Sequence, residues 1–328
     1  MNSNRIAFLF PGQGVQTIGM AKDLYDNIPE CKLILDCSED ILKMPLKKMM
    51  FEGPEEVLTA TENAQPTILV ASLMALKALE INNIHADYCA GLSLGEYAAL
   101  IYGGALSLED GLLLIKERGR IMGSALPEGL GKMAAILKLD DEKFSELLER
   151  AGEFGVIEGA NFNCPGQVSV SGENRAVEEA VKIAKELGGL GIPLKVSGPF
   201  HSSLLTEASE EFYNTIKTAT IKEFNKTVYS NVKGEPYTND DDVKELLVYD
   251  EDSAGGIMTT GYIEINKNMT AKEAINHVID NGVDTFIEVG PGKALRGFVK
   301  KINKNMNLLN VEDVASLNVT VDTIKNMK

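Results

Sequence analysis

A serine lies in a pattern typical of enzyme nucleophiles, Gly91-Leu-Ser-Leu-Gly95. An apolar run precedes this G-x-S-x-G segment and a helical pattern follows it, which is the context of a nucleophile elbow. The flanking glycines leave room for a strained turn, and the N–H after the serine can point at a developing oxyanion. We therefore predict that Ser93 attacks a carbonyl carbon. A glycine-rich turn with a passive serine is the alternative, because short motifs also arise by chance.

A serine hydroxyl needs a base to take its proton, and the sequence has three histidines. His201 lies in Gly198-Pro-Phe-His-Ser202, where the chain returns from a predicted small lobe to a larger one, and lobe junctions line clefts. For His85, in a polar connection, and His277, on a helical stretch, an exposed or hydrogen-bonded structural histidine is the simpler interpretation. His201 is therefore the candidate base, and a structural role for it stays open.

Two further features suit a carbonyl substrate. The Gly12-Gln-Gly14 loop follows the first apolar run and can supply a second backbone N–H to an oxyanion, although an ordinary tight turn has the same pattern. Arg118, on a mostly apolar helical stretch, can present its guanidinium to a substrate carboxylate. On spacing alone, a surface ion pair is the simpler interpretation of Arg118.

These residues require elements that position them, and the hydrophobic pattern predicts an α/β fold. The apolar run Arg5–Phe10 predicts a strand buried on both faces, as in a parallel sheet. A second short strand over 87–91 leads directly to Ser93. The other predicted elements of this part of the fold are a long buried helix over 65–81, a helix from Leu94, a strand over 285–289 and a basic helix from Lys293.

Between Gly131 and Pro199 the predicted order changes to βαββαβ, which is the ferredoxin-like motif. The predicted elements are strand 132–139, helix 141–151, strands 156–161 and 167–171, helix 174–187 and strand 192–197. We therefore expect residues 131–199 to form a small ferredoxin-like domain. It is inserted into a large α/β domain made of residues 1–130 and 200–328.

Composition excludes several classes of protein. The chain has 328 residues, 44% of them hydrophobic, which is enough to bury a large core without disulfide staples. Its 32 basic and 48 acidic residues give a net charge of -16, which argues against binding nucleic acid or a membrane surface. Four cysteines without metal-ligand spacing indicate no metal site and a reducing compartment. The most apolar window, Thr67–Leu76, is too short to cross a bilayer, so we expect a cytoplasmic protein. We also expect a monomer.

Six motifs occur together and strongly resemble the malonyl-CoA:acyl carrier protein transacylase family. They are Phe10-Pro-Gly-Gln-Gly14, Gly91-Leu-Ser-Leu-Gly-Glu96, Glu117-Arg-Gly119, Ala160-Asn-Phe-Asn-Cys-Pro-Gly-Gln167, Gly198-Pro-Phe-His201 and Glu288-Val-Gly-Pro-Gly292. The resemblance implies an α/β-hydrolase-like large domain with a ferredoxin-like small one. It further implies that Ser93 is the nucleophile, that His201 is its base and that Arg118 holds the malonyl carboxylate. The backbones of Gln13 and Leu94 would bind the oxyanion, and Phe200 would border a small acyl pocket.

The implied reaction transfers a malonyl group from malonyl-CoA to the phosphopantetheine thiol of acyl carrier protein, through a malonyl-serine intermediate, in fatty acid biosynthesis. It needs no cofactor beyond the malonyl-CoA substrate. Because a buried guanidinium is costly without a carboxylate partner, acetyl-CoA should be a poor substrate. We expect the acidic carrier protein to dock near Lys293, Arg296, Lys300 and Lys301, although a solvated helix face explains these charges as well.

The sequence departs from the family in two places. Leu92 stands where the family usually has histidine, and we expect altered packing there. Residues 249–275 replace a segment whose glutamine carbonyl orients the catalytic histidine, and they resemble the start of the CBS portion of a magnesium transporter. Asp250 is our candidate for supplying that carbonyl. The acidic runs 240–242 and 250–252 could attract a divalent cation, but a solvated loop is the simpler interpretation.

Two other functions fit the same residues. A serine hydrolase or thioesterase on this scaffold would pass the acyl group to water instead of a thiol. A catalytically impaired acyl-binding regulator would result if the atypical segment disabled His201.

Overall fold

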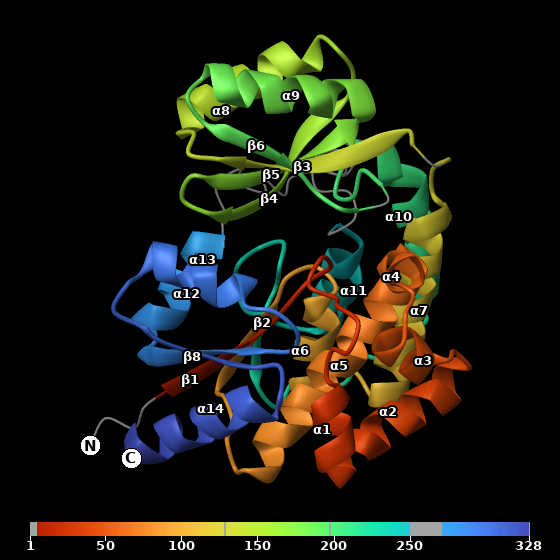
Figure 1. The fold of residues 1–328 in the computed structure, drawn as a ribbon, viewed down its shortest axis with the longest axis vertical. Coiled ribbons are helices and arrows are strands. Elements are labelled where there is room, and N and C mark those ends of the chain that lie inside the picture. The colour runs from red at the N-terminus through yellow and green to blue at the C-terminus, as the bar shows by residue number, and fades with distance from the viewer. Residues whose placement is uncertain (1–4, 128, 197, 250–270, 328) are drawn as a thin grey trace.

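The computed structural model describes residues 5–127, 129–196, 198–249 and 271–327 (Figure 1). Its larger sheet has five strands in the order β7-β2-β1-β8-β9, and all neighbours pair in parallel. These strands are β1 (Arg5–Phe10), β2 (Tyr88–Gly91), β7 (Thr227–Tyr229), β8 (Val283–Val289) and β9 (Asn307–Val311). The prediction of a parallel α/β sheet is confirmed.

Strand β1 lies at the centre of this sheet and is buried on both faces. Phe8 and Phe10 pack into the larger apolar cluster, which includes α5 (Thr61–Ile81) and α6 (Gly95–Tyr102). Ala7 and Leu9 face a second cluster with α12 (Ala271–Asp280) and α13 (Ala294–Ile302). Helices on both faces explain why the strand reads as a continuous apolar run instead of an alternating one.

The remaining helices of the larger part of the fold pack around the five-stranded sheet and against one another (Figure 1). They are α1 (Lys22–Asn27), α2 (Pro29–Leu42), α3 (Leu46–Phe51), α4 (Glu55–Thr59), α7 (Leu108–Ser124), η1 (Ser203–Leu205), α10 (Thr206–Ile216), α11 (Asp240–Tyr249) and α14 (Val314–Met327).

Helix α5 begins at Thr61, four residues before the predicted start, and runs through Pro66. With 21 residues it is the one helix, in the part of the chain that the structure describes, that is long and apolar enough to cross a membrane. However, 83% of its most apolar window is buried inside the protein, which is the arrangement of a core helix.

The smaller sheet is antiparallel, with strand order β4-β5-β3-β6. Its elements are β3 (Gly131–Leu137), α8 (Asp141–Gly152), β4 (Ile157–Cys164), β5 (Gln167–Glu173), α9 (Asn174–Glu186) and β6 (Leu190–Pro193). Helices α8 and α9 pack against one face of it. This βαββαβ order confirms the predicted ferredoxin-like motif. All four strands lie within residues 131–193, and the proposed domain limits at 131 and 199 stay a prediction.

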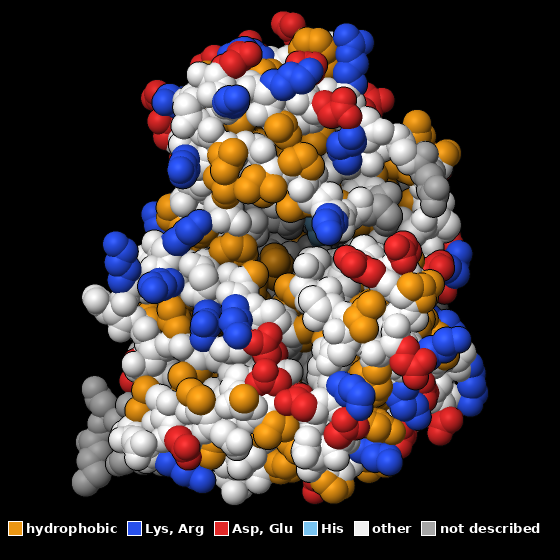
Figure 2. All heavy atoms as spheres, in the orientation of Figure 1, with side chains coloured by type: hydrophobic (Ala, Val, Ile, Leu, Met, Phe, Trp, Pro, Cys, Tyr) orange, Lys and Arg blue, Asp and Glu red, His pale blue; other side chains and the backbone are white. Residues whose placement is uncertain are grey.

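Strand β6 differs from its prediction over 192–197. It begins at Leu190, which pairs with Leu137, and it ends at Pro193, which has no N–H to donate to a ladder. In Figure 1 the smaller sheet and its helices lie above the larger sheet, and Figure 2 shows that the surface is hollowed between the two.

Candidate active site

The serine turn lies at the carboxyl ends of two neighbouring parallel strands. Gly91, at the end of β2, pairs with Phe10 at the end of β1. Ser93 follows with a backbone φ of 50°, and α6 begins two residues later at Gly95. A side chain on Gly91 would overlap the backbone of Gly95, so the close return of the chain requires glycine. This is the strained strand-to-helix geometry that the motif predicted.

The glycine loop after β1 packs against the same turn. A Cβ on Gly12 would lie 2.8 Å from the Leu92 carbonyl oxygen, which places the two loops in backbone contact. Gln13 is half-buried, and its Nε2 donates a hydrogen bond to Thr61 Oγ1 over 3.1 Å. Leu94 is the residue immediately before α6, where the first backbone N–H groups of a helix lack partners within it. The two loops therefore lie side by side at the serine turn, and the assignment of the Gln13 and Leu94 backbones as oxyanion donors stays a prediction.

The Leu92 side chain packs against the apolar cluster of β8, α12 and α13. The expectation of altered packing at this departure from the family stays a prediction.

Arg118 contacts the serine directly. Its Nη2 donates to Ser93 Oγ over 2.9 Å, and its Nη1 donates to Gln65 Oε1 over 2.9 Å. The guanidinium carbon lies 5.8 Å from the centre of the Tyr97 ring, and only 1% of Arg118 is exposed. The interpretation of Arg118 as a surface ion pair is therefore wrong. That description fits Arg120 on the same helix, which is exposed and pairs with Glu117.

A buried carboxyl group is connected to the serine turn through hydrogen bonds. Glu96 on α6 is fully buried, and its Oε1 accepts hydrogen bonds from the Asn231 N–H over 2.7 Å and from the Tyr237 hydroxyl over 2.6 Å. The Asn231 Oδ1 in turn accepts a hydrogen bond from the Ser93 N–H over 3.2 Å. Glu96 therefore fixes Asn231, and Asn231 holds the backbone of the serine.

Replacing Glu96 with alanine should lower the free energy of unfolding by about 2 to 4 kcal/mol, because two buried donors lose their acceptor. Denaturant unfolding measures this loss. Glu149→Ala is the control, since Glu149 is exposed on α8 and its replacement should change stability by less than about 0.5 kcal/mol. Equal stability of the two variants would contradict the role assigned to Glu96.

His201 lies in the turn between the smaller sheet and η1. It is buried, with 6% exposed, and its backbone φ is 60°. Helix α10, which follows η1, packs against α7, the helix that carries Arg118. Phe200 is also buried and belongs to the larger apolar cluster. The assignment of His201 as the base of Ser93 stays a prediction.

The other histidines have the simpler roles expected for them. His277 Nδ1 and the Tyr229 hydroxyl are hydrogen-bonded over 2.8 Å, and His85 is exposed. Asp250, the candidate for a histidine-orienting carbonyl, lies outside the described residues, as does most of the atypical segment. No cluster of metal-ligating side chains occurs among the residues that the structure describes.

Sequence reasoning missed several polar partners of the site. The sequence marks Gln65 only as the first residue of a predicted helix. Its amide is fully buried because α5 packs against α7, and this contact between helices is not evident from the sequence. Asn231 and Tyr237 follow β7 and reach the serine turn from far along the chain. Glu96 was detectable, because a charge within the apolar run of α6 needs a buried partner.

Comparison with known proteins gives consistent matches over nearly the whole chain. The sequence model of the acyl transferase domain family matches residues 7–328. The malonyl CoA-acyl carrier protein transacylase of Bacillus subtilis is 40% identical over 324 residues, which cover 98% of each protein. The crystal structure of the protein of that name from Clostridium perfringens is 42% identical, with a TM-score of 0.89 and 98% of each chain covered.

A third match is a malonyl-transacylase in complex with its type II PKS acyl-carrier protein. It is 29% identical, with a TM-score of 0.89, and the alignment covers 98% of this chain and 100% of that chain.

Proposed function

This chain belongs to the acyl transferase domain family, and we propose that it transfers a malonyl group from malonyl-CoA to the phosphopantetheine thiol of acyl carrier protein in fatty acid biosynthesis. The observation that carries the proposal is the buried Arg118 guanidinium, which donates to Ser93 Oγ. A carboxylate-binding cation beside a nucleophile suits an acyl group that ends in a carboxylate. The relatives named as malonyl transacylases support the same substrate.

In the first half-reaction, Ser93 Oγ attacks the thioester carbonyl and His201 takes the hydroxyl proton. The N–H groups of Gln13 and Leu94 stabilise the oxyanion. When the C–S bond breaks, His201 returns the proton to the CoA thiolate, which leaves malonyl-Ser93. In the second half-reaction, His201 takes the proton of the phosphopantetheine thiol, and the sulfur of that thiol attacks the carbonyl carbon of malonyl-Ser93. The ester C–O bond then breaks, and His201 returns the proton to Ser93 Oγ.

Arg118 binds the free carboxylate of the malonyl group in this scheme. Gln65 holds one side of the guanidinium, so the cation is oriented before the substrate arrives. Phe200 borders the acyl pocket. Acetyl-CoA offers no carboxylate and leaves the buried cation without one, which explains a preference for malonyl over acetyl groups.

The proposal is tested by supplying malonyl-CoA together with acyl carrier protein that carries its phosphopantetheine arm. Malonyl-carrier protein and free malonate are measured in parallel. We expect most of the malonyl group to reach the thiol. Release of malonate alone would favour the hydrolase or thioesterase alternative, and binding of malonyl-CoA without turnover would favour the impaired regulator. The complex of a related malonyl-transacylase with a carrier protein supports the thiol acceptor.

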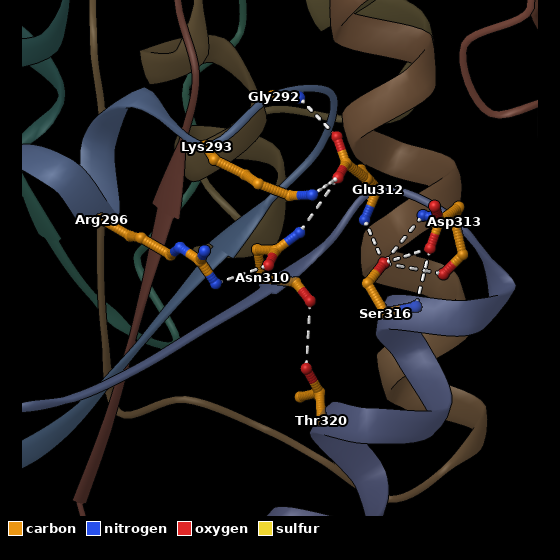
Figure 3. Close-up of polar contacts among 8 residues, drawn as sticks. All are labelled: Gly292, Lys293, Arg296, Asn310, Glu312, Asp313, Ser316 and Thr320. Atoms are coloured by element: carbon orange, nitrogen blue, oxygen red, sulfur yellow. Dashed lines mark hydrogen bonds and ion pairs between the residues drawn. The ribbon is translucent and has the colours of Figure 1, made fainter.

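The predicted docking surface on α13 has to be reduced. Lys293 forms an ion pair with Glu312 over 2.6 Å, and Arg296 Nη1 donates to Asn310 Oδ1 over 2.7 Å (Figure 3). Glu312 also accepts a hydrogen bond from the N–H of Gly292 over 3.1 Å, so these side chains hold α13 and its preceding turn on β9. The two outer lysines, Lys300 and Lys301, are both exposed. Lys301 Nζ donates to Gln167 Oε1 over 2.8 Å, so Lys300 is the better candidate for contact with an acidic partner.

Reversing the charge at Lys300 should raise the KM for acyl carrier protein several-fold at low salt, and the effect should shrink as salt screens the charges. Lys32→Glu is the control, because Lys32 is exposed on α2, away from α13 (Figure 1). An unchanged KM for Lys300→Glu, or an equal rise for Lys32→Glu, would remove α13 from the docking surface.

The cytoplasmic location and the monomeric state are also proposals. All four cysteines are free thiols, which supports a reducing compartment.

A further inference from the structure

A carboxylate on the smaller sheet forms hydrogen bonds with the chain just after His201. Glu158, on β4, accepts a hydrogen bond from the Ser203 N–H at Oε2 and another from the Ser203 hydroxyl at Oε1, each over 2.8 Å. Ser203 begins η1 and lies two residues after the histidine. Hydrogen bonds to an ionised carboxylate are about twice as strong as bonds between neutral groups. Both oxygens of Glu158 are therefore committed to one residue of the histidine turn.

The histidine turn is a conformation that needs such support. His201 has a φ of 60°, in the left-handed region that residues with a side chain occupy at a cost of about 1 to 3 kcal/mol. The Ser202 hydroxyl donates to the Pro199 carbonyl over 2.7 Å inside the buried turn. That bond closes the turn on itself, but it does not fix the turn relative to the rest of the protein.

The entrance of the turn is held by the smaller sheet as well. A Cβ on Gly131, the first residue of β3, would lie 2.5 Å from Pro199 Cγ, so this proline packs directly on the strand that begins the small sheet. Pro199 fixes the chain before His201, and Glu158 fixes it afterwards. The histidine turn is therefore attached to the smaller sheet at both ends, whereas Ser93 and Arg118 lie on elements of the larger part of the fold.

We propose that Glu158 is a positioning residue for His201, which it holds in register with Ser93 through its two hydrogen bonds to Ser203. This inference rests on the proposed function, in which His201 is the base. In this proposal Glu158 acts through Ser203 on the placement of His201, not on the substrate. Its effect arises because proton transfer depends steeply on the placement of the base, and a shift of about 1 Å can cost about 100-fold in rate.

A purely structural role is the competing explanation, and the same sheet offers a matched control. Glu173, at the end of β5, accepts a hydrogen bond from the Val156 N–H over 2.9 Å. It is therefore also a carboxylate that caps a backbone N–H, but at a loop that does not carry His201. Glu173→Ala reports what the loss of such a bond does to stability alone.

The experiment measures the first-order rate of malonyl-enzyme formation at saturating malonyl-CoA, together with the concentration of malonyl-CoA that gives half the maximal rate. Glu158→Ala should lower the rate by roughly 10- to 100-fold. It should change the half-saturating concentration by less than about twofold, because Arg118 still binds the carboxylate. Glu158→Gln keeps one acceptor oxygen and should recover part of the rate. Glu173→Ala should keep the wild-type rate, even if both alanine variants lose similar thermal stability.

Equal rates for Glu158→Ala and Glu173→Ala would overturn the inference. If Glu158→Ala does not fold, Ser203→Ala removes one of the two hydrogen bonds and should still lower the rate by roughly threefold; a wild-type rate for that variant would also overturn it. A wild-type enzyme that forms no malonyl-enzyme at all would instead refute the proposed function, so the two failures are distinguishable.

Discussion

Replacing Arg118 with alanine is expected to remove about 3 to 5 kcal/mol of transition-state stabilisation for malonyl transfer, which corresponds to roughly 150- to 5,000-fold in kcat/KM. In the proposed reaction this buried cation, which donates to Ser93 Oγ, binds the malonyl carboxylate, and the variant lacks it. Acetyl transfer should change much less and can even improve, since an acetyl group never used the cation. Steady-state kinetics with both thioesters measures the difference.

Arg120→Ala is the matched control for this prediction. Arg120 lies two residues further along α7, is exposed, and pairs with Glu117 and Glu211 at the surface. Its loss should leave both transfer reactions nearly unchanged, because exposed ion pairs contribute only about 0 to 1 kcal/mol. Equal losses of malonyl and acetyl transfer in Arg118→Ala would contradict carboxylate recognition and leave Arg118 with a structural role only.

Replacing His201 with alanine is expected to slow malonyl-enzyme formation by about 10²- to 10⁴-fold, the usual contribution of a positioned general base. Without the imidazole, the Ser93 hydroxyl keeps its proton and attacks poorly. Binding of malonyl-CoA should persist, since Arg118 and both oxyanion loops remain. Rapid-quench measurement of the acyl-enzyme separates the slowed step from binding.

The control for the base is His85→Ala, because His85 is exposed and lies outside the site. That variant should form the malonyl-enzyme at the wild-type rate. A wild-type rate in His201→Ala would show that another group takes the proton of Ser93, and the proposed mechanism would then lack its base.

Much of the fold was predictable because its local patterns are strong. Every residue from Ile6 to Phe10 is apolar, and β1 is indeed covered by helices on both faces. The turn around Ser93 was predictable because its glycines are required by backbone contact, not by side-chain packing. Strand β6 was misplaced because its limits depend on pairing with β3, which a single strand does not reveal.

The site was less predictable wherever a role depends on burial. Arg118 reads as a surface residue from spacing alone, and only the packing of α5 against α7 buries it beside Gln65. Arg296 reads as part of a docking surface, but its guanidinium is used by Asn310 on β9. Glu158 carries no motif, and its significance comes from the meeting of β4 with the histidine turn. The roles of these three residues depend on contacts between segments that are far apart in the sequence.

The most direct test of the central claim is the mass of the intact protein after incubation with malonyl-CoA. Wild-type protein is expected to gain one malonyl group and to lose it when acyl carrier protein with its phosphopantetheine thiol is added. Ser93→Ala is expected to gain none. A malonyl adduct that persists in Ser93→Ala, or its absence from the wild-type protein, would contradict the account.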